Sequence, residues 1–118
     1  MSDPALYALL DSLVSAHTRI TSIDDVTAHL RQHPHLIEAV QAAVEATPTV
    51  IGTPYELELL LKSDPEIADY RVLTLVIRLA SYDGNLLEML DHIQDAADRH
   101  VVGESDRLLV TSDFGIIG

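Results

Sequence analysis

Four of the five prolines in this chain stand at the start of an aliphatic run, in the pairs Asp3-Pro4, His33-Pro34, Thr53-Pro54 and Asp64-Pro65. Proline fits the first turn of a helix because the N–H that it lacks would have no partner there, and because its φ angle is already helical. Each pair therefore indicates that one segment ends and a new helix begins. The spacing of the four pairs predicts a series of short helices.

Apolar side chains recur at helical spacing in the first half of the chain. We expect helices from about Pro4 to Ile20, from Ser22 to Pro34, and from Pro34 to about Ala46. Ser22 and Asp25 have the spacing of a helix cap. The first helix has an apolar stripe that contains Leu6, Leu9, Leu10, Leu13, Val14, His17 and Ile20.

The middle of the chain is predicted to contain a loop over Thr47–Thr53 and then two further helices. Thr53-Pro54-Tyr55-Glu56 matches the capping box and predicts a short helix that extends through Leu61. The next run follows Pro65 and includes Arg71–Leu79, which is β-branched and apolar on nearly all sides. Such a run is either a central helix or a buried strand, and the Asp64-Pro65 cap favours the helix.

The last predicted helix follows the turn Asp83-Gly84-Asn85 and ends at Gly103. Its apolar side faces the core, and its other side carries Glu88, Asp91, Asp95 and Asp98. Together the segments predict an all-α fold, a single compact bundle of five or six short helices over residues 1–118. Residues 104–118 are expected to form an irregular tail that docks on the bundle or on a partner. The alternative is an α+β fold in which residues 71–79 form a buried strand.

The charge and composition of the chain restrict its partners. It contains 19 Asp and Glu residues against 7 Lys and Arg, a formal net charge of −12, which argues against direct binding to nucleic acid or to an anionic membrane. The absence of cysteine excludes disulfides, thiol chemistry and Cys-based metal sites. The first residues lack the basic and apolar segments of a signal peptide, and the longest apolar stretch is too short for a membrane span. We therefore expect a cytoplasmic protein.

Three clustered histidines are the nearest approach to a metal site. His29 and His33 are four residues apart and share a helix face, as two zinc ligands would, and His35 follows Pro34. The intervening residues lack the glutamate of the metalloprotease helix, and no third ligand is fixed by the pattern. We therefore predict no tight metal site and no cofactor. A weak His-based metal-dependent protein remains an alternative.

No catalytic motif is present in the sequence, which lacks both the nucleophile elbow and the Gly-rich phosphate loop. The leading prediction is a non-enzymatic intracellular protein–protein interaction module whose partner is either another protein or a second copy of itself in a homodimer. The alternative is an acidic mimic or inhibitor that binds a basic effector or a nucleic-acid-binding protein. The candidate partner-binding residues are Glu88, Asp91, Asp95, Asp98, Leu108, Leu109, Val110, Phe114, Ile116 and Ile117.

The segment Leu30–Leu36, with its core His33-Pro34-x-Leu36 and the aliphatic helix that follows, resembles a known helical element. It is similar to the "His-Pro-x-Leu" helices beside tetratricopeptide arrays in large bacterial proteins that carry caspase-like CHAT peptidase domains. The likeness extends loosely from Asp24 to His100, but the chain lacks the tetratricopeptide Trp-x-x-Leu-Gly-x-x-Tyr pattern and the peptidase residues. The resemblance implies a helical protein-interaction element.

Overall fold

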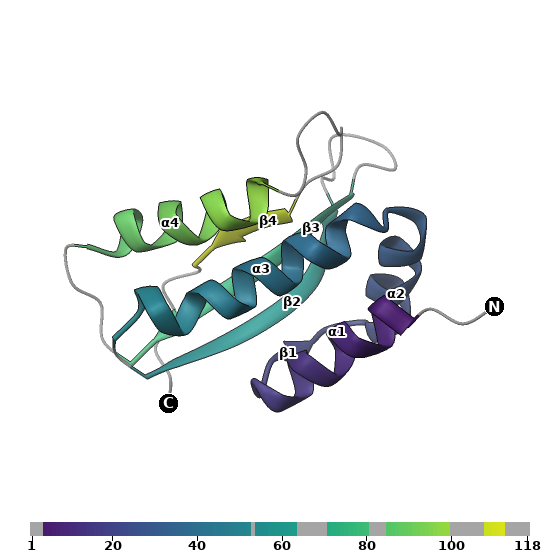
Figure 1. Cartoon of the computed structure of the whole chain (residues 1–118), viewed down its shortest axis with the longest axis horizontal. Helices are drawn as coiled ribbons and strands as arrows, with labels where there is room; N and C mark the ends of the chain where they lie inside the picture. The colour runs from purple at the N-terminus through teal and green to yellow at the C-terminus, as the bar shows by residue number, and fades with distance from the viewer. Residues whose placement is uncertain (1–3, 53, 64–70, 81–84, 100–107, 113–118) are drawn as a thin grey trace.

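The computed structural model describes residues 4–52, 54–63, 71–80, 85–99 and 108–112, which form four helices and a four-stranded sheet (Figure 1). The elements in chain order are α1 (Pro4–Ser15), β1 (Arg19–Ile20), α2 (Ile23–Gln32), α3 (His35–Val50), β2 (Tyr55–Ser63), β3 (Arg71–Leu79), α4 (Leu86–Asp98) and β4 (Leu108–Thr111). The predicted all-α helical bundle is therefore wrong. The fold is α+β, and the alternative in which residues 71–79 form a strand is confirmed.

The sheet is mixed, with the strand order β1-β2-β3-β4. Strands β2 and β3 form an antiparallel hairpin in which Leu59 pairs with Leu75. Strand β1 pairs parallel to β2, and β4 pairs parallel to β3 after the chain has passed through α4. Parallel neighbours require such a crossover connection, which places α4 against a face of the sheet.

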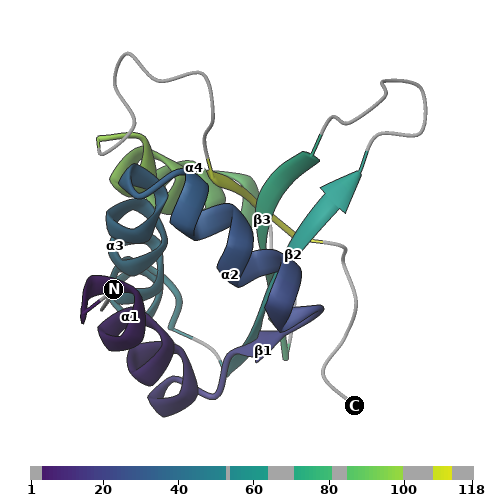
Figure 2. The same cartoon turned by 90° about the vertical axis from the view of Figure 1, so that its right-hand side faces the viewer.

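The helices α3 and α4 pack side by side over one face of the sheet, which we call the inner face (Figure 2). Helix α1 packs on α3, and α2 lies against β2. Leucines of the strands meet aliphatic side chains of the helices in one core, between the sheet and the α3–α4 layer. The strand residues of this core are Leu57, Leu59, Leu73, Leu75, Ile77, Leu79, Leu108 and Val110.

The predicted helix from Pro54 to Leu61 is instead the strand β2. Leu57 and Leu59 are buried in the core, whereas Glu56, Glu58 and Lys62 alternate with them on the opposite face. In a helix, residues two positions apart lie on roughly opposite sides, so a helix would have exposed one of the two leucines. As a strand, the segment buries both leucines and pairs its backbone with β3 over nine residue pairs.

Strand β3 lies between β2 and β4 and is buried from Leu73 to Ile77. A strand that is covered on both faces and paired on both edges is apolar at nearly every position. This position explains why Arg71–Leu79 shows neither a helical nor an alternating pattern. The predicted helix over this run was wrong for that reason.

Helix α1 ends at Ser15 rather than at Ile20, because the chain turns at His17, whose φ angle is 56°. The N–H of His17 donates to Val14 O at 3.0 Å, and the N–H of Thr18 donates to Leu13 O at 2.9 Å. This pair of bonds is the Schellman motif, with a histidine at the left-handed position that glycine usually occupies. The turn frees Arg19 and Ile20 to form β1.

Helix α3 continues through Pro48 to Val50, so the predicted loop over Thr47–Thr53 begins too early. Proline removes one N–H from the last turns, which leaves the carbonyl of Val44, four residues before Pro48, without its usual donor. The hydroxyl of Thr47 donates to Ala43 O at 2.8 Å, and that of Thr49 donates to Ala46 O at 2.7 Å. These two bonds go to neighbouring carbonyls on either side of Val44 and add side-chain donors to the end of the helix.

Candidate functional site

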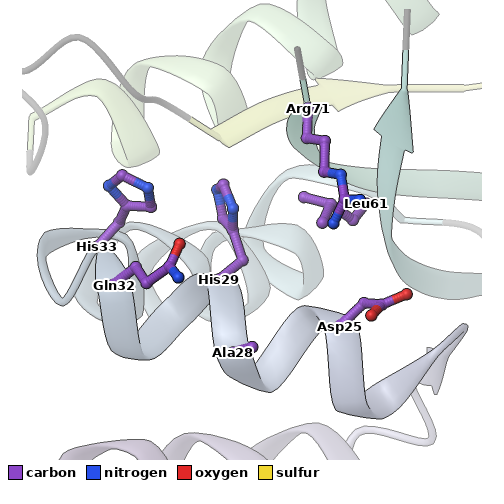
Figure 3. Close-up of a pocket in the computed structure, with 7 residues that line it drawn as sticks. All are labelled: Asp25, Ala28, His29, Gln32, His33, Leu61 and Arg71. Atoms are coloured by element: carbon purple, nitrogen blue, oxygen red, sulfur yellow. The ribbon is translucent and has the colours of Figure 1, made fainter. Parts of the chain in front are cut away.

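A polar cleft among the described residues lies between α2 and the paired ends of β2 and β3 (Figure 3). Its volume is about 440 Å³. Helix α2 contributes residues at three- and four-residue spacing, which therefore share one face of the helix. The described lining residues are Asp25, Ala28, His29, Gln32, His33, Leu61 and Arg71.

Several side chains that can donate hydrogen bonds line the cleft. His29 and His33 are half-buried, and their ring centroids are 4.6 Å apart. Both imidazoles and the amide of Gln32 extend from α2 toward the side on which Arg71 projects from the start of β3 (Figure 3). His35, the third predicted histidine, lies edge-on to His33 at 6.0 Å. Among the described residues, no group of three or more His, Asp or Glu side chains is placed to hold a metal ion.

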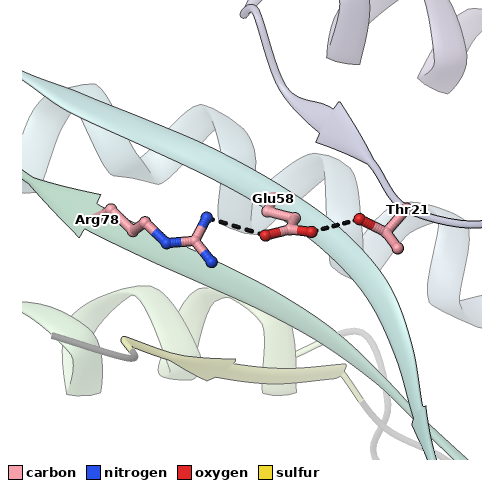
Figure 4. A network of polar contacts seen from close by, with 3 residues as sticks. All are labelled: Thr21, Glu58 and Arg78. Carbon is pink, nitrogen blue, oxygen red and sulfur yellow. Dashed lines mark hydrogen bonds and ion pairs between the residues drawn. The ribbon is translucent and has the colours of Figure 1, made fainter. Parts of the chain in front are cut away.

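A second polar cluster crosses the outer face of the sheet, opposite α3 and α4 (Figure 4). The carboxylate of Glu58 on β2 accepts a hydrogen bond from the Thr21 hydroxyl and forms an ion pair with Arg78 on β3, in which Arg78 Nη1 lies 2.9 Å from Glu58 Oε1. These bonds lower the pKa of Glu58, the Thr21 bond most of all, and they outweigh the burial that would raise it. The cluster therefore joins three neighbouring segments of the sheet.

Replacing Glu58 by glutamine is expected to lower the free energy of unfolding by about 1–3 kcal/mol at neutral pH, because the ion pair with Arg78 is lost. A carboxyl whose pKa is lowered in the folded state stabilises the fold above its ordinary pKa of 4.5 and loses that contribution as the pH falls. The difference between wild type and Glu58→Gln should therefore shrink on acidification. Urea unfolding at pH 7 and near ~3 measures it.

The control for this prediction is Asp91→Asn, which removes the same charge from the exposed surface of α4. It is expected to change the free energy of unfolding by less than ~0.5 kcal/mol. Equal effects of the two variants at neutral pH would contradict the assigned role of the Glu58 cluster.

The acidic residues predicted as partner-binding lie together on α4. Glu88, Asp91 and Asp95 are exposed, and Asp98 is half-buried and accepts a hydrogen bond from Gln94 Nε2 at 3.0 Å. Leu87, which is 70% exposed, lies on the same side of the helix. The exposed surface of α4 therefore combines three carboxylates with one large apolar side chain.

The other predicted partner-binding residues follow α4. Leu108 and Val110 belong to β4 and are buried in the core, while Leu109 is half-buried on the outer face. Leu108 and Val110 therefore pack within this chain. The remaining three, Phe114, Ile116 and Ile117, lie outside the described residues.

The side chain of Gln94, which sequence analysis did not single out, bonds to the edge of β4 that faces away from β3. Its Nε2 donates to Leu108 O at 2.8 Å, and its Oε1 accepts from the Val110 N–H at 2.8 Å. Backbone groups of a strand point along the plane of the sheet, so the amide takes the place of a further strand. Only knowledge that Leu108–Thr111 is an edge strand would have revealed this role.

Sequence analysis also missed an exposed apolar strip on α1. It assigned Leu10 and Val14 to the inner stripe, but Leu10 is only half-buried and Val14 is 70% exposed. Tyr7, at 54% exposure, lies seven residues before Val14 and therefore on the same side of the helix. We call Tyr7, Leu10 and Val14 the α1 strip. Asp11 is the only charged residue in α1.

No helix of the described residues has the length and apolar character needed to cross a membrane. The resemblance to the helices of CHAT-domain proteins remains a prediction. Comparisons of the chain with models of known protein families, with curated proteins and with solved structures find no match.

Proposed function

We propose that this chain is a non-enzymatic protein–protein interaction domain whose partner is a second copy of itself. The observation that carries the proposal is the α1 strip, in which Tyr7 and Val14 are more than half exposed on a helix with one charged residue. The centres of protein interfaces are depleted in charge and enriched in tyrosine and other aromatic side chains. The α1 strip has both properties.

The net charge of the chain favours α1 over other surfaces for self-association. Two copies that each carry a charge of −12 repel one another, and the repulsion is strongest where acidic faces meet. Helix α4 exposes Glu88, Asp91 and Asp95, whereas α1 carries only Asp11. Contact through α1 therefore buries apolar surface at a smaller electrostatic cost than contact through α4. A twofold dimer would place the same strip on both sides of the interface.

The length of α1 limits the strength of such a dimer. Twelve helical residues extend roughly 18 Å, which is too short to bury the ~800 Å² per partner of a standard stable interface. We therefore expect a weak dimer that forms at high protein concentration. Added salt should strengthen it, because salt screens the repulsion between the acidic copies.

Replacing Val14 by glutamate is expected to abolish self-association, because the new carboxylate lies in the α1 strip and faces its symmetry mate. The high exposure of Val14 means that the substitution leaves the core intact. Sedimentation equilibrium at low and moderate salt, over a range of protein concentrations, measures the effect.

The matched control is Ser12→Glu, which adds the same charge to the exposed opposite side of α1 and should retain the dimer. A wild-type chain that stays monomeric at high micromolar concentration in moderate salt would rule out self-association. A dimer that Ser12→Glu and Val14→Glu weaken equally would rule out the α1 strip as its interface.

A second candidate function is binding of a basic partner by α4. The observation that favours it is Leu87, which is 70% exposed beside Glu88 and Asp91 and offers an apolar contact among carboxylates. Attraction between opposite charges weakens with salt, whereas the α1 dimer strengthens. Capture of a basic protein at low salt, with release at moderate salt, would favour this function over self-association.

A further inference from the structure

We propose that the cleft between α2 and the β2–β3 hairpin is a binding site for a small organic anion that carries a phosphate or carboxylate group. This proposal is independent of self-association through the α1 strip. It rests on the side chains that the fold brings together in the cleft, on the charge of its lining and on its size (Figure 3).

The side chains in the cleft are suited to an anion. The guanidinium of Arg71 offers several N–H donors in one plane, a geometry that matches the two oxygens of a carboxylate or phosphate. Gln32 and His29 project from α2 toward the space beside Arg71 (Figure 3), and the amide and imidazole each supply an N–H donor. His33 extends this row of donors to the end of α2. Donors from a helix and a strand thus converge on one space.

The charge of the lining contrasts with that of the chain. The sequence carries 19 acidic residues, but Asp25 is the single acidic side chain in the described lining of the cleft. Asp25 lies two helical turns before His33, on the same side of the cleft as Arg71 and Leu61, while Gln32 and His33 lie at the other end (Figure 3). Because charge interactions are strongest at short range, an anion between Arg71 and His29, on the side of Arg71 away from Asp25, is attracted locally although the whole chain is acidic.

The size and the apolar part of the cleft indicate an organic ligand. Its volume of about 440 Å³ lies within the range of small-molecule sites. That space exceeds what a bare phosphate ion needs. The side chains of Ala28 and Leu61 also line the cleft and offer apolar contact to a carbon skeleton. The expected ligand is therefore a small phosphate monoester or a small carboxylic acid.

The test is a titration of the full chain, followed by backbone amide NMR, with three probes: inorganic phosphate, glycerol 3-phosphate and succinate. Saturable shifts of the amide signals of Ala28, His29 and Arg71 are expected for at least one probe, with a dissociation constant near ~1 mM or below. Tighter binding of glycerol 3-phosphate identifies a phosphate monoester as the ligand class. Tighter binding of succinate identifies a carboxylate.

Substitutions in the cleft test whether the probes bind there. Arg71→Gln is expected to weaken binding by roughly tenfold or more, since it removes charge-assisted hydrogen bonds to the anion. His29→Gln is expected to weaken binding less. The matched control is Arg99→Gln, which removes the same charge from an exposed residue after α4 and should leave the affinity within about twofold.

Two results would overturn the proposal. One is the absence of saturable shifts with all three probes at concentrations up to about ten times the expected dissociation constant. The other is equal weakening by Arg71→Gln and Arg99→Gln, which would show that the probes respond to the net charge of the chain. Neither result would affect the oligomeric state on which the proposed function depends.

Discussion

Replacing Leu75 by alanine is expected to lower the free energy of unfolding by about 2–5 kcal/mol. Leu75 is fully buried in β3, with Leu59 of β2 and Val110 of β4 as its partners in register. Truncation removes apolar contacts and leaves a cavity that the paired strands cannot close. Urea unfolding followed by circular dichroism measures the loss. Because small domains are stable by only about 5–15 kcal/mol, this loss is a large fraction of the total stability.

Two further variants test the same prediction if Leu75→Ala does not fold. Ile77→Val, at another fully buried position of β3, should cost about 0.5–1.5 kcal/mol and leave the chain folded. Leu87→Ala removes the same atoms as Leu75→Ala from a side chain that is 70% exposed, and should cost less than ~1 kcal/mol. Similar losses for Leu75→Ala and Leu87→Ala would contradict the central position of β3.

Replacing Gln94 by leucine is expected to have two effects. The free energy of unfolding should fall by about 1–3 kcal/mol, because the Leu108 carbonyl and the Val110 N–H lose their partner at the edge of β4. The uncovered edge should also pair with the edge of another molecule, since unpaired strand edges are templates for association. Urea unfolding and light scattering after gel filtration measure the two effects.

The matched control is Gln41→Leu, which removes a half-buried glutamine from α3. Its amide donates to Glu45 within the same helix at 3.3 Å, so the expected change is within ~0.5 kcal/mol. Association of Gln94→Leu should persist when Val14→Glu is added, because it uses a different surface from the α1 strip. A monomeric Gln94→Leu variant with unchanged stability would contradict the role of Gln94 at the edge.

The helical half of the fold could be predicted from the sequence, because the backbone hydrogen bonds of a helix form between residues that are close in the sequence. The stripes of α2 and α4 have the period of 3.6 residues, and the structure places both ends of α2 and the start of α4 close to the predicted bounds. Helix α4 ends at Asp98, and its predicted end at Gly103 lies outside the described residues. The same pattern predicted that Glu88, Asp91 and Asp95 would share the exposed side of α4. The end of α1 could not be predicted, because His17 adopts a left-handed conformation that usually requires glycine. The sequence has no glycine at this position to indicate the turn.

The strands could not be assigned in the same way. Thr53–Lys62 contains both a capping-box match, which predicts a helix, and an alternation of apolar and charged residues, which is typical of a strand. Arg71–Leu79 has no period at all, because both of its faces are buried. Whether such a run becomes a strand depends on the neighbours that pair with its backbone, and those are distant in sequence.

The sequence by itself determined the acidic charge, the amphipathic helices and their approximate bounds, since these follow from composition and from local hydrogen bonding. Only the tertiary structure decided that β2, β3 and β4 form a sheet, that Gln94 covers its edge, and that Arg71 meets α2 across the cleft. Each of these features joins residues from separate elements. The contacts that stabilise these features form only after the chain has folded, so no local sequence pattern predicts them.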